Sequence, residues 1–135
     1  MKRFILDSNV VSEPRPDPAV LAWIETAAEW YLPSPVVAEI QEGAQAVTSE
    51  SRRDEINSRL ETYSTLMLDW DAGTSRVWGS LKHSPEVRRQ PQALWDSLID
   101  AIAVRFECVV ATRNGDDFRH ASTFNPWDGS ERIRA

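Results

Sequence analysis

The stretch FILDSN (residues 4–9), close to the start of the chain, indicates both the fold class and a candidate site. Its apolar run 4–6 predicts a short buried strand, and Asp7 places a carboxylate where this run ends. Ser8 and Asn9 follow, small polar residues that commonly begin a turn or cap a helix. Because ligands and metals bind at the carboxyl edge of a parallel sheet, Asp7 is a candidate metal ligand.

Further apolar runs predict strands, and the segments between them have helical spacing. The predicted strands cover residues 4–6, 31–32, 66–68, 109–111 and 123–124. The predicted helices cover residues 18–28, 34–47, 51–63, 72–81 and 92–106. This alternation predicts an α/β protein with one central, mostly parallel sheet and helices on both of its faces.

Local signals refine these elements. Pro18 suits the first turn of its helix, whose apolar face extends to Ala28, and Ser34 is the expected N-cap of the next helix. The segment 83–92 (HSPEVRRQPQ) is expected to be a solvated loop, although it could contact a substrate. His83 and His120 are expected on the surface.

Length and composition indicate one globular domain. A chain of 135 residues with 41% apolar and 27% charged residues suits a single domain over 1–135, with a core of about 3–127 and a short polar C-terminal tail. The net charge of -6 argues against a broad basic nucleic-acid surface. That argument is a modest one, because a metal-dependent nuclease gathers carboxylates at its site.

The single cysteine and the absence of targeting patterns indicate the compartment. Cys108 cannot form an internal disulfide, and it is expected to be a buried thiol in a reducing environment. No apolar stretch of about 18 residues or signal-peptide pattern is present, so we expect a cytoplasmic protein with no membrane partner.

Acidic residues recur near the predicted strand ends and helix starts. Glu39 lies among apolar residues early in its helix, and Asp96 lies near the start of the most strongly patterned helix. Asp100 follows Asp96 by one turn and is expected on the same face, opposite the apolar stripe of that helix. Solvent, an arginine or a bound cation would offset the repulsion between the two carboxylates.

A further polar group follows the strand predicted at 109–111. Asn114, Asp116 and Asp117 come at its carboxyl end, where a fourth ligand would belong in a parallel-sheet site. Oxygen donors without cysteine or ligand-spaced histidine favour Mg²⁺ or Mn²⁺.

Five segments in order resemble the PIN-domain ribonucleases, and more narrowly the VapC/FitB-like toxins of type II toxin–antitoxin pairs. They are LDSNVVSEP (6–14), SPVVAEIQEG (34–43), DSLIDAIA (96–103), VVATRNGDDF (109–118) and FNPW (124–127). The resemblance implies that Asp7, Glu39 and Asp96 are the catalytic acids and hold Mg²⁺, with Mn²⁺ as a substitute. Asn114 occupies a position that holds an acid in some relatives and Asn in others.

The resemblance also implies roles for neighbouring residues. Ser8 and Asn9 match the polar pair beside the first acid, and Asp117 matches a position that more often bonds to its own loop. Asp100 replaces a residue that is usually small. These residues and Asn114 are expected to orient water or substrate around the metal.

The activity that the resemblance implies is metal-dependent hydrolysis of RNA phosphodiester bonds. The implied partners are RNA, a cognate antitoxin whose basic tail covers the acidic site, and a second copy of the chain. Toxin, antitoxin and operator DNA would form a larger assembly.

Two other interpretations stay open. A phosphatase with a nucleophilic aspartate after its first strand would carry a second acid two positions later, where this chain has Asn9. The second alternative is a degenerate PIN domain that only binds RNA or a protein, and it stays open because Asn114 is neutral where some relatives have an acid.

Overall fold

A mixed sheet forms the centre of the molecule. The computed structural model describes residues 2–27 and 29–134, and within them the strand order is β3-β2-β1-β4-β5-β6. Strands β1 to β5 run parallel, and β6 pairs antiparallel with β5. The strands are β1 (Phe4–Leu6), β2 (Trp30–Pro33), β3 (Met67–Leu68), β4 (Val109–Ala111), β5 (Thr123–Phe124) and β6 (Glu131–Arg132).

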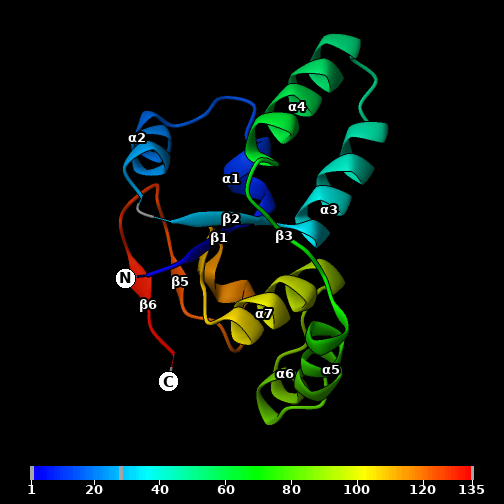
Figure 1. Cartoon of the computed structure of the whole chain (residues 1–135), viewed down its shortest axis with the longest axis vertical. Helices are drawn as coiled ribbons and strands as arrows, with labels where there is room; N and C mark the ends of the chain where they lie inside the picture. Colours follow the sequence, from blue (N-terminus) through cyan, green and yellow to red (C-terminus); the bar gives the residue numbers. More distant parts are fainter. Residues whose placement is uncertain (1, 28, 135) are drawn as a thin grey trace.

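Helices cover both faces of this sheet, as Figure 1 shows. Helices α1 to α4 lie on one side, and α5, α6 and α7 lie on the other. Their bounds are α1 (Ser8–Ser12), α2 (Pro18–Thr26), α3 (Ser34–Gln45), α4 (Glu50–Tyr63), α5 (Ala72–Leu81), α6 (Pro85–Arg89) and α7 (Leu94–Phe106). A 3-10 turn, η1 (Gly115–Asp117), follows β4. The fold class predicted from the sequence is therefore confirmed.

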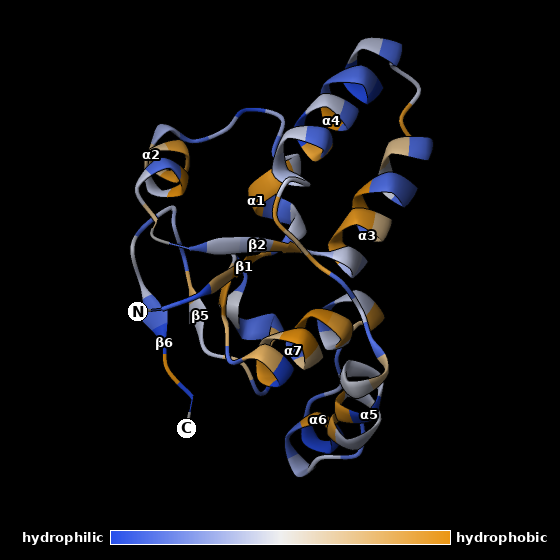
Figure 2. Ribbon diagram, in the orientation of Figure 1, coloured by the Kyte–Doolittle hydropathy of each residue, from blue (hydrophilic) through white to orange (hydrophobic). Residues whose placement is uncertain are grey.

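The core lies where the two central strands meet the helices. Ile5 and Leu6 of β1 and Val110 and Ala111 of β4 are fully buried, and Figure 2 shows apolar colour along β1 and on α7. Leu6 pairs in register with Ala111. The residues that follow these two strands therefore leave the sheet side by side at its carboxyl edge.

The predicted strands are all present, and β6 is an additional strand. The predicted helices are present with ends that differ by a few residues, and Ala28 lies outside the described residues. Ser34, however, is not an N-cap, because the helix already begins at this residue and Pro33 precedes it. The Ser34 hydroxyl instead accepts a hydrogen bond of 3.0 Å from the backbone N–H of Trp70, which ties α3 to the end of β3.

The segment 83–92 is not the simple loop expected from its sequence. It contains α6, whose first turn is capped by the Ser84 hydroxyl, and Val87 of this helix is buried. His120 was expected on the surface but is partly buried, with its Nε2 2.9 Å from the Ser84 hydroxyl. This contact fixes α6 against the segment that leads into β5.

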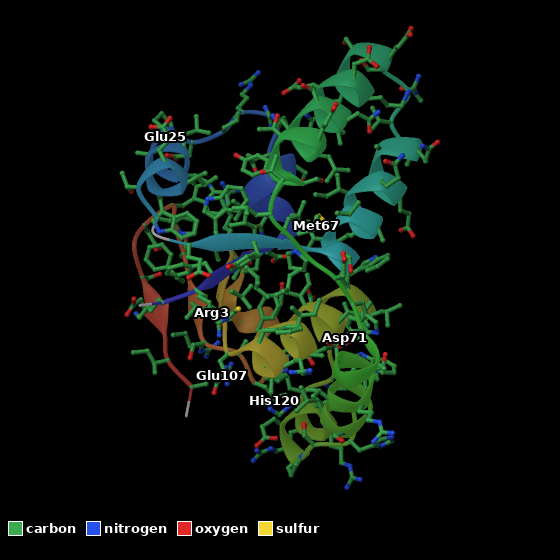
Figure 3. The ribbon with its side chains drawn as sticks, in the orientation of Figure 1. Arg3, Glu25, Met67, Asp71, Glu107 and His120 are labelled. Carbon is green, nitrogen blue, oxygen red and sulfur yellow. The ribbon has the colours of Figure 1, made fainter. Side chains whose placement is uncertain are left out.

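The junction between α7 and β4 is made by a residue with left-handed backbone. Glu107 has φ 55°, and the chain turns there directly from the helix into the buried Cys108 and the central strand (Figure 3). The burial expected for Cys108 is confirmed. No helix in the described parts of the chain is long and apolar enough to cross a bilayer.

Candidate functional site

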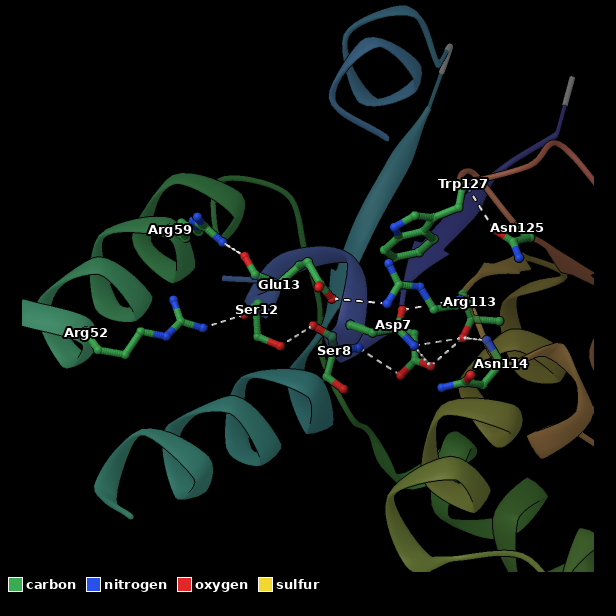
Figure 4. A network of polar contacts seen from close by, with 12 residues as sticks. Asp7, Ser8, Ser12, Glu13, Arg52, Arg59, Arg113, Asn114, Asn125 and Trp127 are labelled. Carbon is green, nitrogen blue, oxygen red and sulfur yellow. Dashed lines mark hydrogen bonds and ion pairs between the residues drawn. The ribbon is translucent and has the colours of Figure 1, made fainter. Parts of the chain in front are cut away.

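Asp7 lies where β1 ends and is almost fully buried, with 5% of its surface exposed. Its Oδ1 accepts a hydrogen bond of 2.8 Å from the backbone N–H of Ser8, so the carboxylate also caps α1 (Figure 4). Its Oδ2 accepts one of 2.7 Å from the Thr112 hydroxyl. Burial still raises the pKa of Asp7, and the Asp117 charge raises it further, while the bonds from Thr112 and Ser8 oppose the shift.

Thr112 connects the two central strands at this edge. It follows β4 as Asp7 follows β1, and its hydroxyl accepts hydrogen bonds from the Asn9 side chain at 3.3 Å and the Asn114 backbone N–H at 3.0 Å. The sequence prediction did not include Thr112 among the site residues. The signal was present in the Thr-Arg-Asn segment directly after the strand, since the residue following β4 must lie beside the one following β1.

Glu39 comes to the same edge because α3 begins directly where β2 ends. Its side chain is partly buried, and its Oε1 is buried without a hydrogen-bond partner in the described part of the chain. Burial is the main cause that raises the pKa of Glu39, and the charge of Asp7 is the second; the nearby Ser8 hydroxyl lowers it. Glu39 is therefore a carboxylate with an unused buried acceptor oxygen.

Asp96 lies in the first turn of α7 and completes this group from the other face of the sheet. Desolvation, followed by the charges of Asp7, Asp117 and Glu39, raises its pKa from 3.8 to about 7. Arg119 opposes this shift. The charges of Asp7, Asp117 and Glu39 all act on Asp96, so the four carboxylates share this edge of the sheet. We call Asp7, Glu39, Asp96 and Asp117 the acidic cluster.

The fourth member is Asp117 rather than the residue at the motif position. Asp117 is exposed on η1, and its charge acts on both Asp7 and Asp96. Asn114 is also exposed, and its backbone N–H is what reaches Thr112. The structure thus places Asn114 at the rim and gives the fourth charge of the edge to Asp117.

Ser8 and Asn9 hold the first acid in place. The Asn9 side chain spans from α1 to the β4 loop: its amide donates to Thr112, and its oxygen accepts from the backbone N–H of Arg113 at 3.3 Å. Arg113 in turn stacks on the Trp127 ring at 4.2 Å and lies 3.5 Å from a Glu13 carboxylate oxygen (Figure 4). These contacts link α1, the loop after β4 and the segment after β5 beside Asp7, and the sequence analysis did not predict them.

Asp100 was expected opposite the apolar stripe of α7, with solvent, an arginine or a cation to offset its charge, and the structure shows a different compensation. The residue is buried, with 1% of its surface exposed. Its carboxylate accepts hydrogen bonds from the backbone N–H groups of Arg119 (3.2 Å), His120 (3.1 Å) and Ala121 (2.8 Å), and from Gln92 (3.3 Å). These donors, rather than solvent or a cation, compensate its charge, and Asp100 fixes the segment before β5.

The donor set of the acidic cluster fits a hard divalent cation. As the side chains stand, no three of the described Asp, Glu, His or Cys residues already form a complete ligand group. The cluster nevertheless offers only oxygen donors, includes the unpartnered Oε1 of Glu39, and places the charge of Asp7 where it raises the pKa of both Glu39 and Asp96. A cation with oxygen preference relieves this repulsion, so the residues present suit Mg²⁺ or Mn²⁺.

Comparison with known proteins agrees with this arrangement. The family model of the PIN domain matches residues 4–123. The chain belongs to the PIN domain family. No curated protein sequence matches it significantly.

Solved structures of other proteins share most of this fold. FitAcB from Neisseria gonorrhoeae is 25% identical, with a TM-score of 0.75 over 92% of this chain and 98% of that chain. VapBC2 from Rickettsia felis, bound to a DNA fragment from its promoter, is 19% identical, with a TM-score of 0.71 over 83% and 87%. VapBC-5 from Mycobacterium tuberculosis, of the VapBC family of toxin–antitoxin systems, is 19% identical, with a TM-score of 0.68 over 84% and 86%. The resemblance of this PIN domain to the VapC/FitB-like group is thereby confirmed.

Proposed function

We propose that this PIN domain is an Mg²⁺-dependent ribonuclease and the toxin of a type II toxin–antitoxin pair. The observation that carries the proposal is the acidic cluster, in which carboxylates from four separate segments come to the carboxyl edge of the sheet; burial and neighbouring carboxylates raise the pKa of Asp7, Glu39 and Asp96. Clustered acids with perturbed pKa values mark functional sites more often than structural ones. The relatives that share the fold include toxin–antitoxin complexes, which supports the biological role.

Asp7, Asp96 and Glu39 would hold the cation. When bound, it supplies positive charge against the scissile phosphate and lowers the pKa of a coordinated water, with Mn²⁺ as a possible substitute. Asp7 is the best fixed of the three, because Thr112 and Ser8 hold both of its oxygens. Glu39 and Asp96 keep acceptor capacity for a ligand.

The remaining polar residues at the edge would position water and substrate. Asp117 is exposed, and its carboxylate accepts no hydrogen bond from the described residues, so it is free to orient a water molecule beside Asp96. Asn114 presents an amide at the rim that can bond a phosphate or sugar oxygen. Ser8 acts on two of the acids: its backbone N–H lowers the pKa of Asp7, and its hydroxyl lowers the pKa of Glu39.

An antitoxin tail would bind in the groove next to the cluster on the side of α1, α3 and α4. This groove has a volume of about 450 Å³, and its lining combines two acids (Glu39 and Glu42) and one arginine (Arg52) with apolar Ile40, Ile56 and Trp95. A basic amphipathic segment matches such a lining in both charge and apolar surface. The net charge of -6 favours a basic inhibitor in the same way.

The wider assembly follows from the relatives. FitAB has been solved on the IR36 DNA fragment and VapBC2 on promoter DNA, so we propose that this chain joins its antitoxin on operator DNA. We also propose a homodimer, because the sequence resemblance implies one, and a cytoplasmic location, because the one cysteine is a free buried thiol that suits a reducing environment. Light scattering of the purified chain tests the dimer.

The decisive experiment compares Asp7→Asn with Asp54→Asn, a matched change of an exposed acid on α4. The proteins are incubated with total RNA in Mg²⁺ or in EDTA, and circular dichroism checks the fold. We expect Asp7→Asn to lose RNA cleavage and cell toxicity by about 10³-fold or more, as loss of a metal ligand implies. Asp54→Asn should cleave normally, and EDTA should stop every cleavage.

Other outcomes identify the alternatives. Full cleavage by Asp7→Asn, or cleavage unaffected by EDTA, contradicts the proposed site. RNA left intact with phosphate released from a small monoester indicates the phosphatase. RNA bound but uncut in both Mg²⁺ and Mn²⁺ indicates a binding module.

A further inference from the structure

A cavity rich in arginine lies beyond the acidic cluster. It has a volume of about 590 Å³ and is lined by Arg89 of α6, Arg119 of the segment before β5, Arg132 of β6 and Arg134. Glu86 and Asp116 are the acids in its lining, so the arginines outnumber them by two. This positive excess is unusual on a chain with a net charge of -6. We call it the arginine cavity.

The charges of these arginines are largely uncompensated. Arg119 donates to the backbone carbonyls of Gln90 (2.7 Å) and Pro91 (3.4 Å), which hold its side chain but carry no negative charge. Arg134 similarly donates to the Phe118 carbonyl at 2.6 Å. Of these four arginines, only Arg132 forms a salt bridge within the described residues, with Asp116 at 2.5 Å. The guanidinium groups of Arg119 and Arg134 are thus fixed in place by neutral acceptors and remain able to attract an anion.

Arg89 is the least committed member. It lies at the last position of α6 and is exposed, and its side chain makes no hydrogen bond or ion pair within the described part of the chain, although its charge helps to lower the pKa of Glu86. A guanidinium presents a planar set of N–H donors that matches phosphate oxygens in pairs. Arg89 can therefore bind a phosphate without first giving up another partner.

The arginine cavity adjoins a second cavity at the acidic edge of the sheet. This second cavity, of about 450 Å³ and lined by Thr112, Asn114 and Asp117, shares Asp116 and Arg132 with it. The charge of Arg119 also reaches Asp96, because it lowers the pKa of that acid. A strand that enters the acidic cluster can continue across the second cavity into the arginine cavity.

We infer that the arginine cavity binds backbone phosphates of a single-stranded RNA a short distance from the bond placed at the acidic cluster. The substrate class rests on the proposed function. The acidic cluster repels a polyanion, so a strand held there needs cationic contacts nearby. A concave site of this volume admits the backbone of a single strand, and grooves of positive charge that follow the backbone are the usual device for such strands.

The test uses two neighbouring arginines of α6. Arg89 lines the cavity, whereas Arg88 is exposed and does not, so Arg89→Gln and Arg88→Gln make the same change in charge on the same turn. Binding of a fluorescent single-stranded RNA oligonucleotide is measured by anisotropy in EDTA, over a series of salt concentrations. No cleavage is needed, so the result does not depend on catalysis.

We expect Arg89→Gln to weaken RNA binding about two- to fivefold at low salt, which is typical of losing one exposed ion pair. The slope of log affinity against log salt should fall by about 0.7, the change for one phosphate contact on a single strand. Arg88→Gln should bind as the unchanged protein does, and Arg89→Lys should retain most of the slope.

Equal weakening by Arg88→Gln and Arg89→Gln would overturn the inference, since net charge alone would explain it. So would an effect of Arg89→Gln on duplex DNA of the same length that is larger than its effect on RNA. Failure here is distinct from failure of the proposed function. If Arg89→Gln binds RNA normally while Asp7→Asn loses cleavage, the RNA contact in the arginine cavity is wrong and the proposed nuclease stands. If Arg89→Gln weakens RNA binding while Asp7→Asn cleaves normally, the proposed catalytic site is wrong and the RNA contact stands.

Discussion

Asp96 and Asp100 lie one turn apart on the same helix, yet their surroundings are opposite. Asp100 is buried and accepts hydrogen bonds from three consecutive backbone N–H groups and from Gln92. Asp96 has other carboxylates as its neighbours, which together with desolvation raise its pKa to about 7. Fixed donors match the negative charge of Asp100, whereas the Asp96 carboxylate lies among like charges and accepts no hydrogen bond from the described residues.

This difference separates a structural acid from a candidate ligand. Donors that the fold supplies at fixed positions stabilise a buried carboxylate, and nothing further needs to bind. A group of acids that raise one another's pKa weakens the fold unless a cation binds. The same residue type at helical spacing can therefore serve opposite purposes on one element.

The largest effect is expected from Asp96→Asn in the RNA cleavage assay. Loss of a carboxylate that holds the cation should lower the cleavage rate by about 10³-fold, or about 4 kcal/mol of activation free energy. The fold should not suffer, since the change removes repulsion from the acidic cluster. Cleavage is measured in saturating Mg²⁺, and urea unfolding is measured on the same sample. A variant that cleaves RNA at the original rate would remove Asp96 from the site.

Asp100→Asn should show the reverse pattern. The amide has one acceptor oxygen in place of two and turns an NH₂ group toward the N–H groups of Arg119, His120 and Ala121. Leaving such buried donors unpaired costs about 3 kcal/mol, so the free energy of unfolding should fall by about that amount. Asp96→Asn is the matched control for this measurement.

In the cold, where Asp100→Asn remains folded, it should still cleave RNA. If Asp100→Asn instead keeps full stability and loses only cleavage, Asp100 belongs to the acidic cluster and the contrast between the two residues disappears.

Much of the site could be predicted from the sequence, because its acids follow strand ends and helix starts. The positions of Asp7, Glu39 and Asp96 could be predicted from the strand order and from motifs in a known order, because ligands bind at the carboxyl edge of a parallel sheet. Asp100 could not be placed in this way. Its partners are backbone N–H groups about twenty residues downstream, and helical periodicity reports spacing along one element but no donors from another.

Similar reasons explain the other differences. The Thr112 hydroxyl acquires its role only when β1 and β4 pair in register. The segment 83–92 looked like a loop from its prolines and charges, and only the packing of Val87 and the contact between Ser84 and His120 show why a short helix forms there. Its Arg89 gains importance from arginines that are far away in sequence.

The smallest effect concerns the stability of the metal-free protein against pH. The pKa of Asp96 is raised from 3.8 to about 7 on folding, so between these values the folded protein holds a proton that the unfolded chain has released. Stability should therefore fall as pH rises through this window, by about 1–2 kcal/mol once solvent screening of the partly exposed carboxyl is allowed for. Urea unfolding in EDTA at pH 5 and pH 8 measures this drop in stability. The drop should be smaller in Asp96→Asn and unchanged in Asp100→Asn.

Adding Mg²⁺ at pH 8 should restore stability in the unchanged protein, because the cation binds the ionised cluster of the folded state. A drop that persists undiminished in Asp96→Asn would assign the titration to another group and weaken the contrast between the two acids of α7.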